Sequence, residues 1–167
     1  MKKELAQMVT AKAYKEKYMR GISCIKNLIQ AYEVQCRQKD GSTPIQMVDY
    51  RIKAPESIAD KLERKGYGVS FVNAEQYLSD LAGIRVVCFS KEDVYAMDHF
   101  LCNCEEITIV KRKDYISKPK ANGYKSIHLI AELDNPEKIR VEIQIRTQDM
   151  HCWAEADHRR VYKKLTK

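Results

Sequence analysis

One short segment near the C-terminus constrains the fold more than any other part of the sequence. Residues 138–146 alternate strictly between apolar and long polar side chains, which is the period of a β-strand. The apolar set is Ile139, Val141, Ile143 and Ile145, and the polar set is Arg140, Glu142, Gln144 and Arg146. One face therefore belongs to a core. Taken alone, the other face is more typical of an exposed sheet surface with cross-strand ion pairs than of a polar cleft floor.

The remaining pattern predicts an α+β fold, with a mixed sheet of about five strands flanked by helices. Helical spacing over residues 3–38, with Leu5, Met8 and Val9 early in it, predicts either one helix or two, and Gly21 is the candidate break between two. Strands are expected at 45–53, 82–89, 106–111, 124–133 and 138–146. Further helices are expected from Pro55 to Gly66, after Ser90 and over 148–164, and residues 112–123 are expected to form a loop. Ser90 would cap its helix, with Asp93 three residues on as a variant of the capping box.

Length and charge limit the class of protein. The 167 residues suit a single domain with its own core. The 30 Lys and Arg outnumber the 23 Asp and Glu, and the net charge of +7 favours an anionic partner such as a nucleotide, nucleic acid or acidic membrane. A well-solvated surface explains the same charge equally well. No stretch is long and apolar enough to span a membrane, and several of the six cysteines lie in apolar segments. A reduced, cytoplasmic protein follows.

Two neighbouring strands are expected to extend the polar face of residues 138–146. In the strand at 124–133, Ser126, His128 and Ile130 share one face. In the strand at 45–53, Arg51 and Lys53 lie together. Cationic and hydrogen-bonding side chains at this density are typical of a phosphate-binding surface.

A pair of carboxylates completes the pattern. Asp80 directly precedes the buried strand at 82–89, and Glu142 lies on the polar face of 138–146. Two carboxylates among phosphate-binding cations suit a magnesium–triphosphate complex, because Mg²⁺ binds carboxylate and phosphate oxygens together. An Asp at such a position is also a common cap or surface charge, so the sequence leaves both interpretations open.

Five segments, in this order, resemble the synthetase domain of the RelA/SpoT family, across roughly residues 45–165. They are residues 51–57 (RIKAPES), 80–85 (DLAGIR), 113–116 (KDYI), 118–128 (KPKANGYKSIH) and 141–147 (VEIQIRT). The resemblance implies a nucleotidyltransferase-like fold in one alarmone synthetase domain spanning 1–167. Residues 1–44 would form an N-terminal helical region, and residues 45–165 the catalytic core.

The activity that the resemblance implies is that of a GTP diphosphokinase, which moves the β,γ-diphosphate of ATP to the 3′-hydroxyl of GDP or GTP, with GMP as a further candidate acceptor and Mg²⁺ as cofactor. Asp80 and Glu142 would hold the metal, and Glu142 would activate the hydroxyl. Arg51 and Arg85 would sandwich adenine, with Lys53, Lys61 and Ser57 also on the ATP side. Tyr124 would stack on guanine. The remaining acceptor contacts would be Asn122, His128, Lys113, Lys120, Gln144 and Arg146.

Two further points bear on the resemblance. The basic motif begins here with Lys111-Arg112-Lys113-Asp114, where many family members have Arg first, so the preferred acceptor stays open. The sequence has no His-Asp dipeptide, the signature of the hydrolase half of the family, and we expect no alarmone hydrolysis. The resemblance also implies a homo-oligomer of undetermined size.

Two alternatives use the same residues differently. A pyrophosphokinase could act on another acceptor, such as the 3′ end of a tRNA or an adenine nucleotide, and the net charge is compatible with RNA contact. A non-catalytic nucleotide- or RNA-binding module would need neither Asp80 nor Glu142.

The expected C-terminal helix carries one more motif. His151, Glu155 and His158 recur at i, i+4 and i+7, which places them on one helix face. Histidines satisfied by protein groups are commoner than metal ligands, so this spacing alone does not indicate a metal site.

Overall fold

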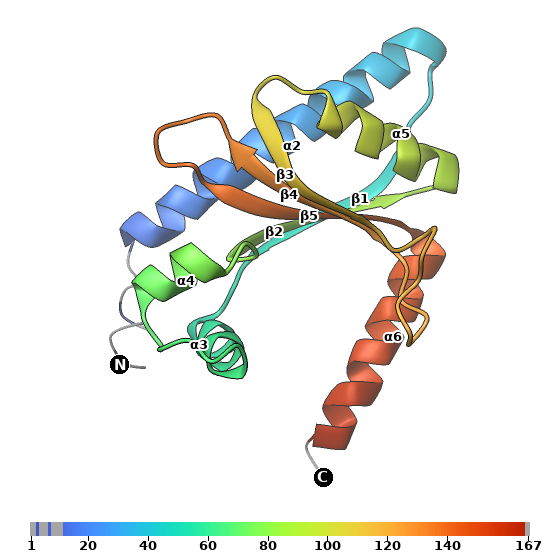
Figure 1. Cartoon of the computed structure of the whole chain (residues 1–167). Helices are drawn as coiled ribbons and strands as arrows, with labels where there is room; N and C mark the ends of the chain where they lie inside the picture. The colour runs from blue at the N-terminus through green and yellow to red at the C-terminus, as the bar shows by residue number, and fades with distance from the viewer. Residues whose placement is uncertain (1–2, 4–6, 8–11, 166–167) are drawn as a thin grey trace.

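The protein is built on one five-stranded mixed sheet, described by a computed structural model that covers residues 3, 7 and 12–165 (Figure 1). Leu5, Met8 and Val9 lie outside the described residues. The strands are β1 (Ile45–Ile52), β2 (Ala82–Cys88), β3 (Ile107–Asp114), β4 (Ile127–Leu133) and β5 (Arg140–Thr147), and their order is β1-β2-β5-β4-β3. Only β2 and β5 pair in parallel. The predicted fold class is confirmed.

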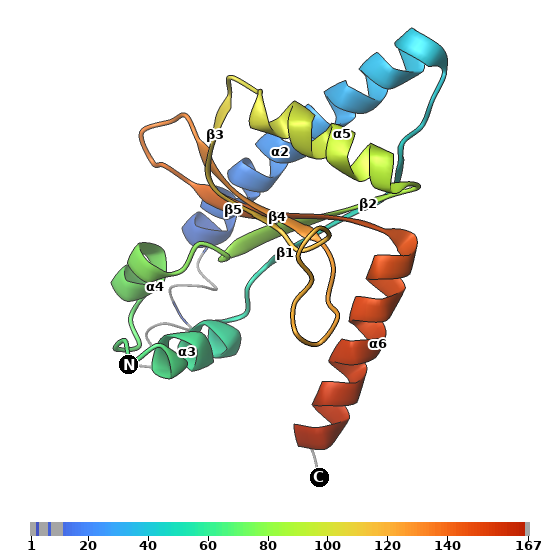
Figure 2. The same cartoon turned by 45° about the vertical axis from the view of Figure 1, so that its right-hand side comes forward.

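The helices divide between the two faces of the sheet. α2 (Lys12–Asp40) and α5 (Lys91–Cys102) cover one face, and α3 (Pro55–Arg64), α4 (Phe71–Tyr77) and α6 (Gln148–Leu165) lie on the other side (Figures 1 and 2). α3 and α6 project from opposite ends of that second face and leave its middle open. No helix in the described part of the chain is long and apolar enough to cross a membrane.

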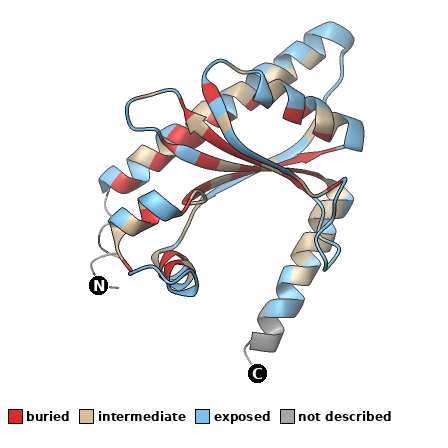
Figure 3. Ribbon diagram, viewed as in Figure 1, coloured by how far each residue is buried: buried red, intermediate tan, exposed pale blue. Residues whose placement is uncertain are grey.

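Most of the core lies between the sheet and the pair α2 and α5, and the same buried cluster continues to Ile58 and Leu62 of α3 and Ala74 of α4 (Figure 3). Val141, Ile143 and Ile145 of β5 are fully buried, and so are Ile127 and Leu129 of β4. Burial of such side chains contributes roughly 1.5–3 kcal/mol each. The alternation predicted for β5 is therefore confirmed, and it turns Glu142 and Gln144 toward the open face.

Local capping explains where several elements begin. Ser90 accepts a hydrogen bond from the Asp93 backbone N–H at the start of α5, and the Asp93 carboxylate accepts one from the Ser90 N–H, which confirms the predicted capping box. Pro55 occupies the first turn of α3, as predicted. The sequence analysis did not predict α4, a short helix capped by the Ser70 side chain.

The candidate break at Gly21 is the first correction, and it leaves the single-helix interpretation of the N-terminal segment. Gly21 does not break the N-terminal helix, because α2 runs unbroken from Lys12 to Asp40. Instead, a Cβ atom at this position would lie 2.8 Å from Ile139 Cγ2 and 3.0 Å from Val141 Cγ2. The glycine lets the helix approach the sheet closely at the start of β5.

The segment 112–123 is the second correction, because β3 continues through Asp114 before the loop begins. Pairing with β4 sets Arg112 opposite Leu129 and Lys113 opposite His128. Arg112 therefore points away from the polar face and binds the carboxylate of Asp98 on α5, with a 2.7 Å bond from Nη2. Its neighbours Lys111 and Lys113 stay on the polar face.

We expect Gly21→Ala to destabilise the protein by about 1–2 kcal/mol, because overpacking at Ile139 and Val141 outweighs the better helix propensity of alanine. Urea unfolding measures the change. Ser23→Ala, at an exposed position on the same helix, is the control and should be neutral or slightly stabilising. A stabilised Gly21→Ala protein would contradict the close packing of α2.

Arg112→Ala should cost about 1–3 kcal/mol of stability, because it leaves the Asp98 carboxylate, 5% exposed, without its charged partner. Lys111→Ala removes the same charge from the adjacent, exposed position and should stay within about 0.5 kcal/mol of the parent. Equal effects of the two substitutions in thermal unfolding would exclude a specific role for the Arg112–Asp98 pair.

Candidate active site

Two rows of side chains cross the open face of the sheet. The strand registers fix both rows, since directly opposed residues point to the same side. The first row runs Asp49, Arg85, Gln144, His128 and Lys113. The second row runs Arg51, Gly83, Glu142, Ile130 and Lys111. The polar face predicted from three strands thus extends over all five.

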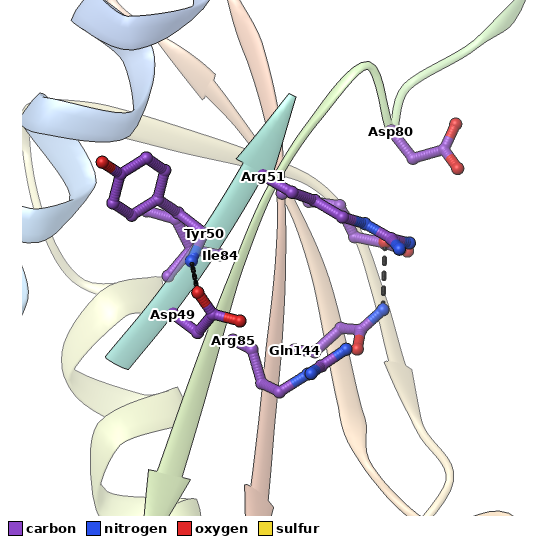
Figure 4. A pocket seen from close by; sticks show the side chains of 9 residues that line it. Asp49, Tyr50, Arg51, Asp80, Ile84, Arg85 and Gln144 are labelled. Carbon is purple, nitrogen blue, oxygen red and sulfur yellow. Dashed lines mark hydrogen bonds between the residues drawn. The ribbon is translucent and has the colours of Figure 1, made fainter. Parts of the chain in front are cut away.

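A pocket opens where these rows meet the start of β2. Its lining brings together the predicted metal ligands and the two predicted adenine contacts: Asp49, Tyr50, Arg51, Asp80, Gly83, Ile84, Arg85, Glu142 and Gln144. Figure 4 shows the side chains of Arg51, Arg85 and Gln144 extending to the same side, while Tyr50 points away. Gly83 carries no side chain between Arg51 and Glu142, which leaves this part of the floor open.

Asp80 is held by two lysines. Its Oδ2 atom accepts hydrogen bonds from Lys53 Nζ at 2.9 Å and from Lys61 Nζ at 2.6 Å. Burial acts to raise the pKa of this carboxyl, but the two ammonium groups outweigh burial and hold the pKa below its usual value. The carboxylate is charged at neutral pH, and its other oxygen, Oδ1, is buried without a hydrogen-bond partner.

Glu142 is held by the first row. His128 Nδ1 lies 3.3 Å from its Oε1 atom, and Gln144 Nε2 donates to its Oε2 atom at 3.2 Å. Burial acts to raise the pKa of Glu142, and the nearby charge of Asp80 adds to this. The hydrogen bonds and charge from His128, with Gln144, outweigh both and leave the pKa below its usual value.

The donor set around Asp80 and Glu142 fits Mg²⁺. Both groups are carboxylates in one pocket, and Asp80 Oδ1 has an unfilled acceptor site. Within the described ranges no three His, Cys, Asp or Glu side chains cluster closely enough to hold a metal ion alone. A metal ion held by these two carboxylates would therefore need phosphate oxygens and water to complete its coordination.

The predicted acceptor residues gather around one aromatic cluster. Tyr124 Oη lies 2.8 Å from His128 Nε2, and the Tyr115 ring meets both rings edge to face. Lys120 Nζ lies 4.7 Å from the Tyr115 ring centre and 4.9 Å from that of Tyr124. Lys113 Nζ lies 5.8 Å from the Tyr115 ring centre. His128 therefore links the Tyr124 hydroxyl to Glu142.

The loop that carries Tyr124 is shaped by a turn. Gly123 has a φ of +88°, a conformation that suits glycine, and Trp153 of α6 lies 3.4 Å from where its Cβ would be. Asn122 accepts from the Tyr124 N–H at 3.1 Å and donates to Asp157 of α6 at 3.3 Å. Asn122 thus orients the loop.

Arg146 lies deeper than the other predicted acceptor residues. Its side chain is 2% exposed, and Nη2 bonds to His151 Nδ1 at 2.9 Å. Glu155 Oε1 lies 3.3 Å from Arg85 Nη1 and 3.9 Å from Arg146 Nη2. A direct contact between Arg146 and a bound nucleotide would therefore require a rearrangement at this site.

A second pocket adjoins the first beside α3. Ser57, at the start of α3, lines it together with Arg51, Lys53 and His158 of α6. All the residues predicted for the ATP side therefore line one of the two pockets or, like Lys61, bind Asp80.

Sequence reasoning assigned no site role to Glu155, Asp157 or Tyr115. The spacing of His151, Glu155 and His158 did place them on one helix face, but their partners became visible only with the tertiary structure. His151 and Glu155 face the arginines of the sheet.

Comparison with known proteins agrees with this geometry. The family model described as "Region found in RelA / SpoT proteins" matches residues 50–167. GTP pyrophosphokinase YwaC of Bacillus subtilis is 41% identical over 128 residues, which cover 74% of this chain and 61% of YwaC. GTP pyrophosphokinase YjbM of the same organism is 30% identical over 151 residues, covering 87% and 70%. The matched part of this chain thus spans less than two thirds of YwaC.

A solved structure has the same fold. The crystal structure of small alarmone synthetase 1 from Bacillus subtilis, bound to its product pppGpp, superposes with a TM-score of 0.77 and 30% identity. The superposition covers 88% of this chain and 78% of the synthetase.

Proposed function

This chain belongs to the RelA/SpoT family, and from that premise we propose that it makes (p)ppGpp, by transferring the β,γ-diphosphate of ATP to the 3′-hydroxyl of GDP or GTP and releasing AMP. The relatives named GTP pyrophosphokinase and the synthetase bound to pppGpp support this activity and this choice of substrates. The proposal extends to residues 1–167 as one synthetase domain, with a helical region at 1–44 and a catalytic core at 45–165.

The convergence of Asp80 and Glu142 carries the proposal. Both carboxylates line one pocket, and Asp80 keeps a buried oxygen without a hydrogen-bond partner. A module that only bound a nucleotide would gain nothing from two half-buried carboxylates in one pocket, because they repel its phosphates. A bound Mg²⁺, held by Asp80 and Glu142, would offset the negative charge of the triphosphate during transfer.

The donor side follows from the cations. Arg51 and Arg85 present planar guanidinium groups suited to stacking on the adenine ring. Lys53 and Lys61 already lie at Asp80, so they are positioned to neutralise phosphate oxygens beside it. Ser57, in the first turn of α3, would add a hydroxyl donor in the adjoining pocket.

The acceptor side follows from the aromatic cluster. Tyr124 would stack on the guanine base of the acceptor, and Lys113 and Lys120 would lie near the phosphates of that nucleotide. Asn122 and His128 would orient the acceptor. Glu142 has a lowered pKa and so is charged at neutral pH, and it would accept the proton of the 3′-hydroxyl. The 3′ oxygen then bonds to the β-phosphorus as the bond from that phosphorus to the oxygen of the leaving AMP breaks.

The test is incubation of the purified chain with ATP, Mg²⁺ and, in separate reactions, GDP, GTP, GMP or tRNA. We expect AMP and a 3′-diphosphorylated guanine nucleotide, resolved by anion-exchange chromatography, with none formed in EDTA. If tRNA were labelled in preference to every free nucleotide, the acceptor would be tRNA instead of GDP or GTP. If no diphosphate were transferred to any of them, the proposed function would be wrong. A cytoplasmic homo-oligomer, testable by fractionation and light scattering, is the setting that we propose for this activity.

Glu142→Gln and Asp80→Asn should each lower kcat by about 10²–10⁴-fold, because each removes a charged group that the transition state uses. Initial rates of AMP release measure the loss. Glu132→Gln is the matched control, since Glu132 is a carboxylate of β4 that pairs with Arg140 outside the pocket. Its rate should stay within about 2-fold of the parent. Full activity in Asp80→Asn would contradict the metal-binding role.

Tyr124→Ala should raise the KM for GDP about 10-fold or more, since stacking of a base on an aromatic ring contributes about 1–3 kcal/mol. Tyr124→Phe keeps the ring and loses only the hydroxyl bond to His128, so its KM should stay within about 3-fold of the parent. Initial rates at saturating ATP separate the two outcomes. A phenylalanine variant as impaired as the alanine variant would assign the effect to the hydroxyl instead.

A further inference from the structure

The helix α6 follows β5 directly and rises from the edge of the polar face (Figure 2). Its first turns therefore lie beside side chains of β2 and β5 that point to this face. Two of these side chains are arginines, Arg85 and Arg146, and both belong to the face that carries the site. The partners that α6 supplies to them determine where each guanidinium points.

The two arginines are close enough to repel. Arg85 lies opposite Gln144, and Arg146 lies opposite Val87, two residues further along both strands on the same face. The pKa of Arg146 lies below its usual value, first because of burial and second because of the positive charge of Arg85. Two like charges that are partly removed from water need an anionic or hydrogen-bond-accepting partner to stay together.

α6 supplies a different acceptor to each arginine. Arg146 bonds to the imidazole nitrogen Nδ1 of His151 at 2.9 Å, and because arginine only donates, that nitrogen accepts the bond without a proton. The carboxylate of Glu155 is 3.3 Å from Arg85 Nη1 and 3.9 Å from Arg146 Nη2. His151 thus accepts a hydrogen bond from Arg146 Nη2, and the charge of Glu155 stays directed mainly at Arg85.

We propose that Glu155 is a positioning residue, which holds the guanidinium of Arg85 at the donor pocket so that it is oriented before ATP binds. The inference rests on the proposed function, because it takes the pocket lined by Arg51 and Arg85 as the ATP side. Without Glu155, Arg85 would lose its ion pair on α6 while still facing Arg146, and it would sample other rotamers. The ordering cost would then fall on ATP binding.

The opposite side of the same helix provides a control. Asp157 lies two residues after Glu155, about 200° around the helix, and accepts a hydrogen bond from Asn122 of the Tyr124 loop. Trp153, one turn before Asp157, packs on Gly123 of that loop. Glu155 therefore faces the donor side and Asp157 faces the acceptor side, although both are acidic residues of one helix.

The experiment compares Glu155→Ala with Asp157→Ala. Calorimetric titration with Mg²⁺ and the non-hydrolysable analogue α,β-methylene ATP measures donor affinity without catalysis. Glu155→Ala should weaken binding of the analogue and raise the KM for ATP, both about 5–10-fold, with kcat changed less than about 3-fold. Asp157→Ala should leave analogue affinity within about 2-fold and shift only the KM for GDP. Glu155→Gln retains an acceptor and should lie between Glu155→Ala and the parent.

A double-mutant cycle identifies the route. If Glu155 acts through Arg85, then adding Glu155→Ala to the Arg85→Ala variant should weaken binding of the analogue by less than a further factor of about 2. Losses that multiply would overturn the inference, and so would equal effects of Glu155→Ala and Asp157→Ala on analogue affinity. Urea unfolding of each variant identifies any that loses affinity through misfolding, and Glu155→Gln then replaces it in the cycle.

Failure of the inference is distinct from failure of the proposed function. A parent protein that binds the analogue and makes the 3′-diphosphate product, with Glu155→Ala binding as well as the parent, removes only the role of Glu155. A parent protein that forms no product removes the proposed function.

Discussion

The parallel pairing of β2 with β5 is the constraint on which the site depends. Because these strands run in the same direction, β2 and β5 begin at the same end of the sheet, and Gly83 lies opposite Glu142. Asp80, three residues before Gly83, is thereby brought to the same pocket as Glu142. An antiparallel pairing would have separated these two carboxylates by the length of a strand. The long connection that parallel strands require here carries α5 and the β3–β4 pair.

Electrostatic balance in the pocket is arranged before any ligand arrives. Lys53 and Lys61 neutralise Asp80. His128 and Gln144 bind Glu142. On α6, Glu155 accepts from Arg85 and His151 accepts from Arg146. These partners offset the free-energy cost of removing the charged side chains from water. They also leave Lys53 and Lys61 beside Asp80, where a magnesium–triphosphate would bind. On binding, the two lysines would exchange Asp80 for phosphate oxygens, so the charged side chains would already be in place.

The sequence predicted what depends on short-range pattern and missed what depends on long-range contact. Alternation over residues 138–146 correctly gave both faces of β5, and Ser90 with Asp93 correctly gave the start of α5. The sequence left one or two N-terminal helices open, with Gly21 as the candidate break, because the packing reason for this glycine lies in Ile139 and Val141, which are distant along the chain. The end of β3 was misjudged because Pro and Gly downstream of Arg112 resemble loop, whereas pairing with β4 extends the strand. The partners of Glu155 have no local signal at all.

Gly83 gives the floor of the pocket an unusual vulnerability. It lies between Arg51 and Glu142, and the nearest atom to a Cβ at this position, the Glu142 carbonyl oxygen, is at an ordinary 3.7 Å. A Cβ atom is therefore compatible with the sheet, but it would stand in the space that we propose for the nucleotide. A relative with alanine here could keep its strand pairing while part of the proposed nucleotide site is filled, so the fold could outlast the loss of nucleotide binding.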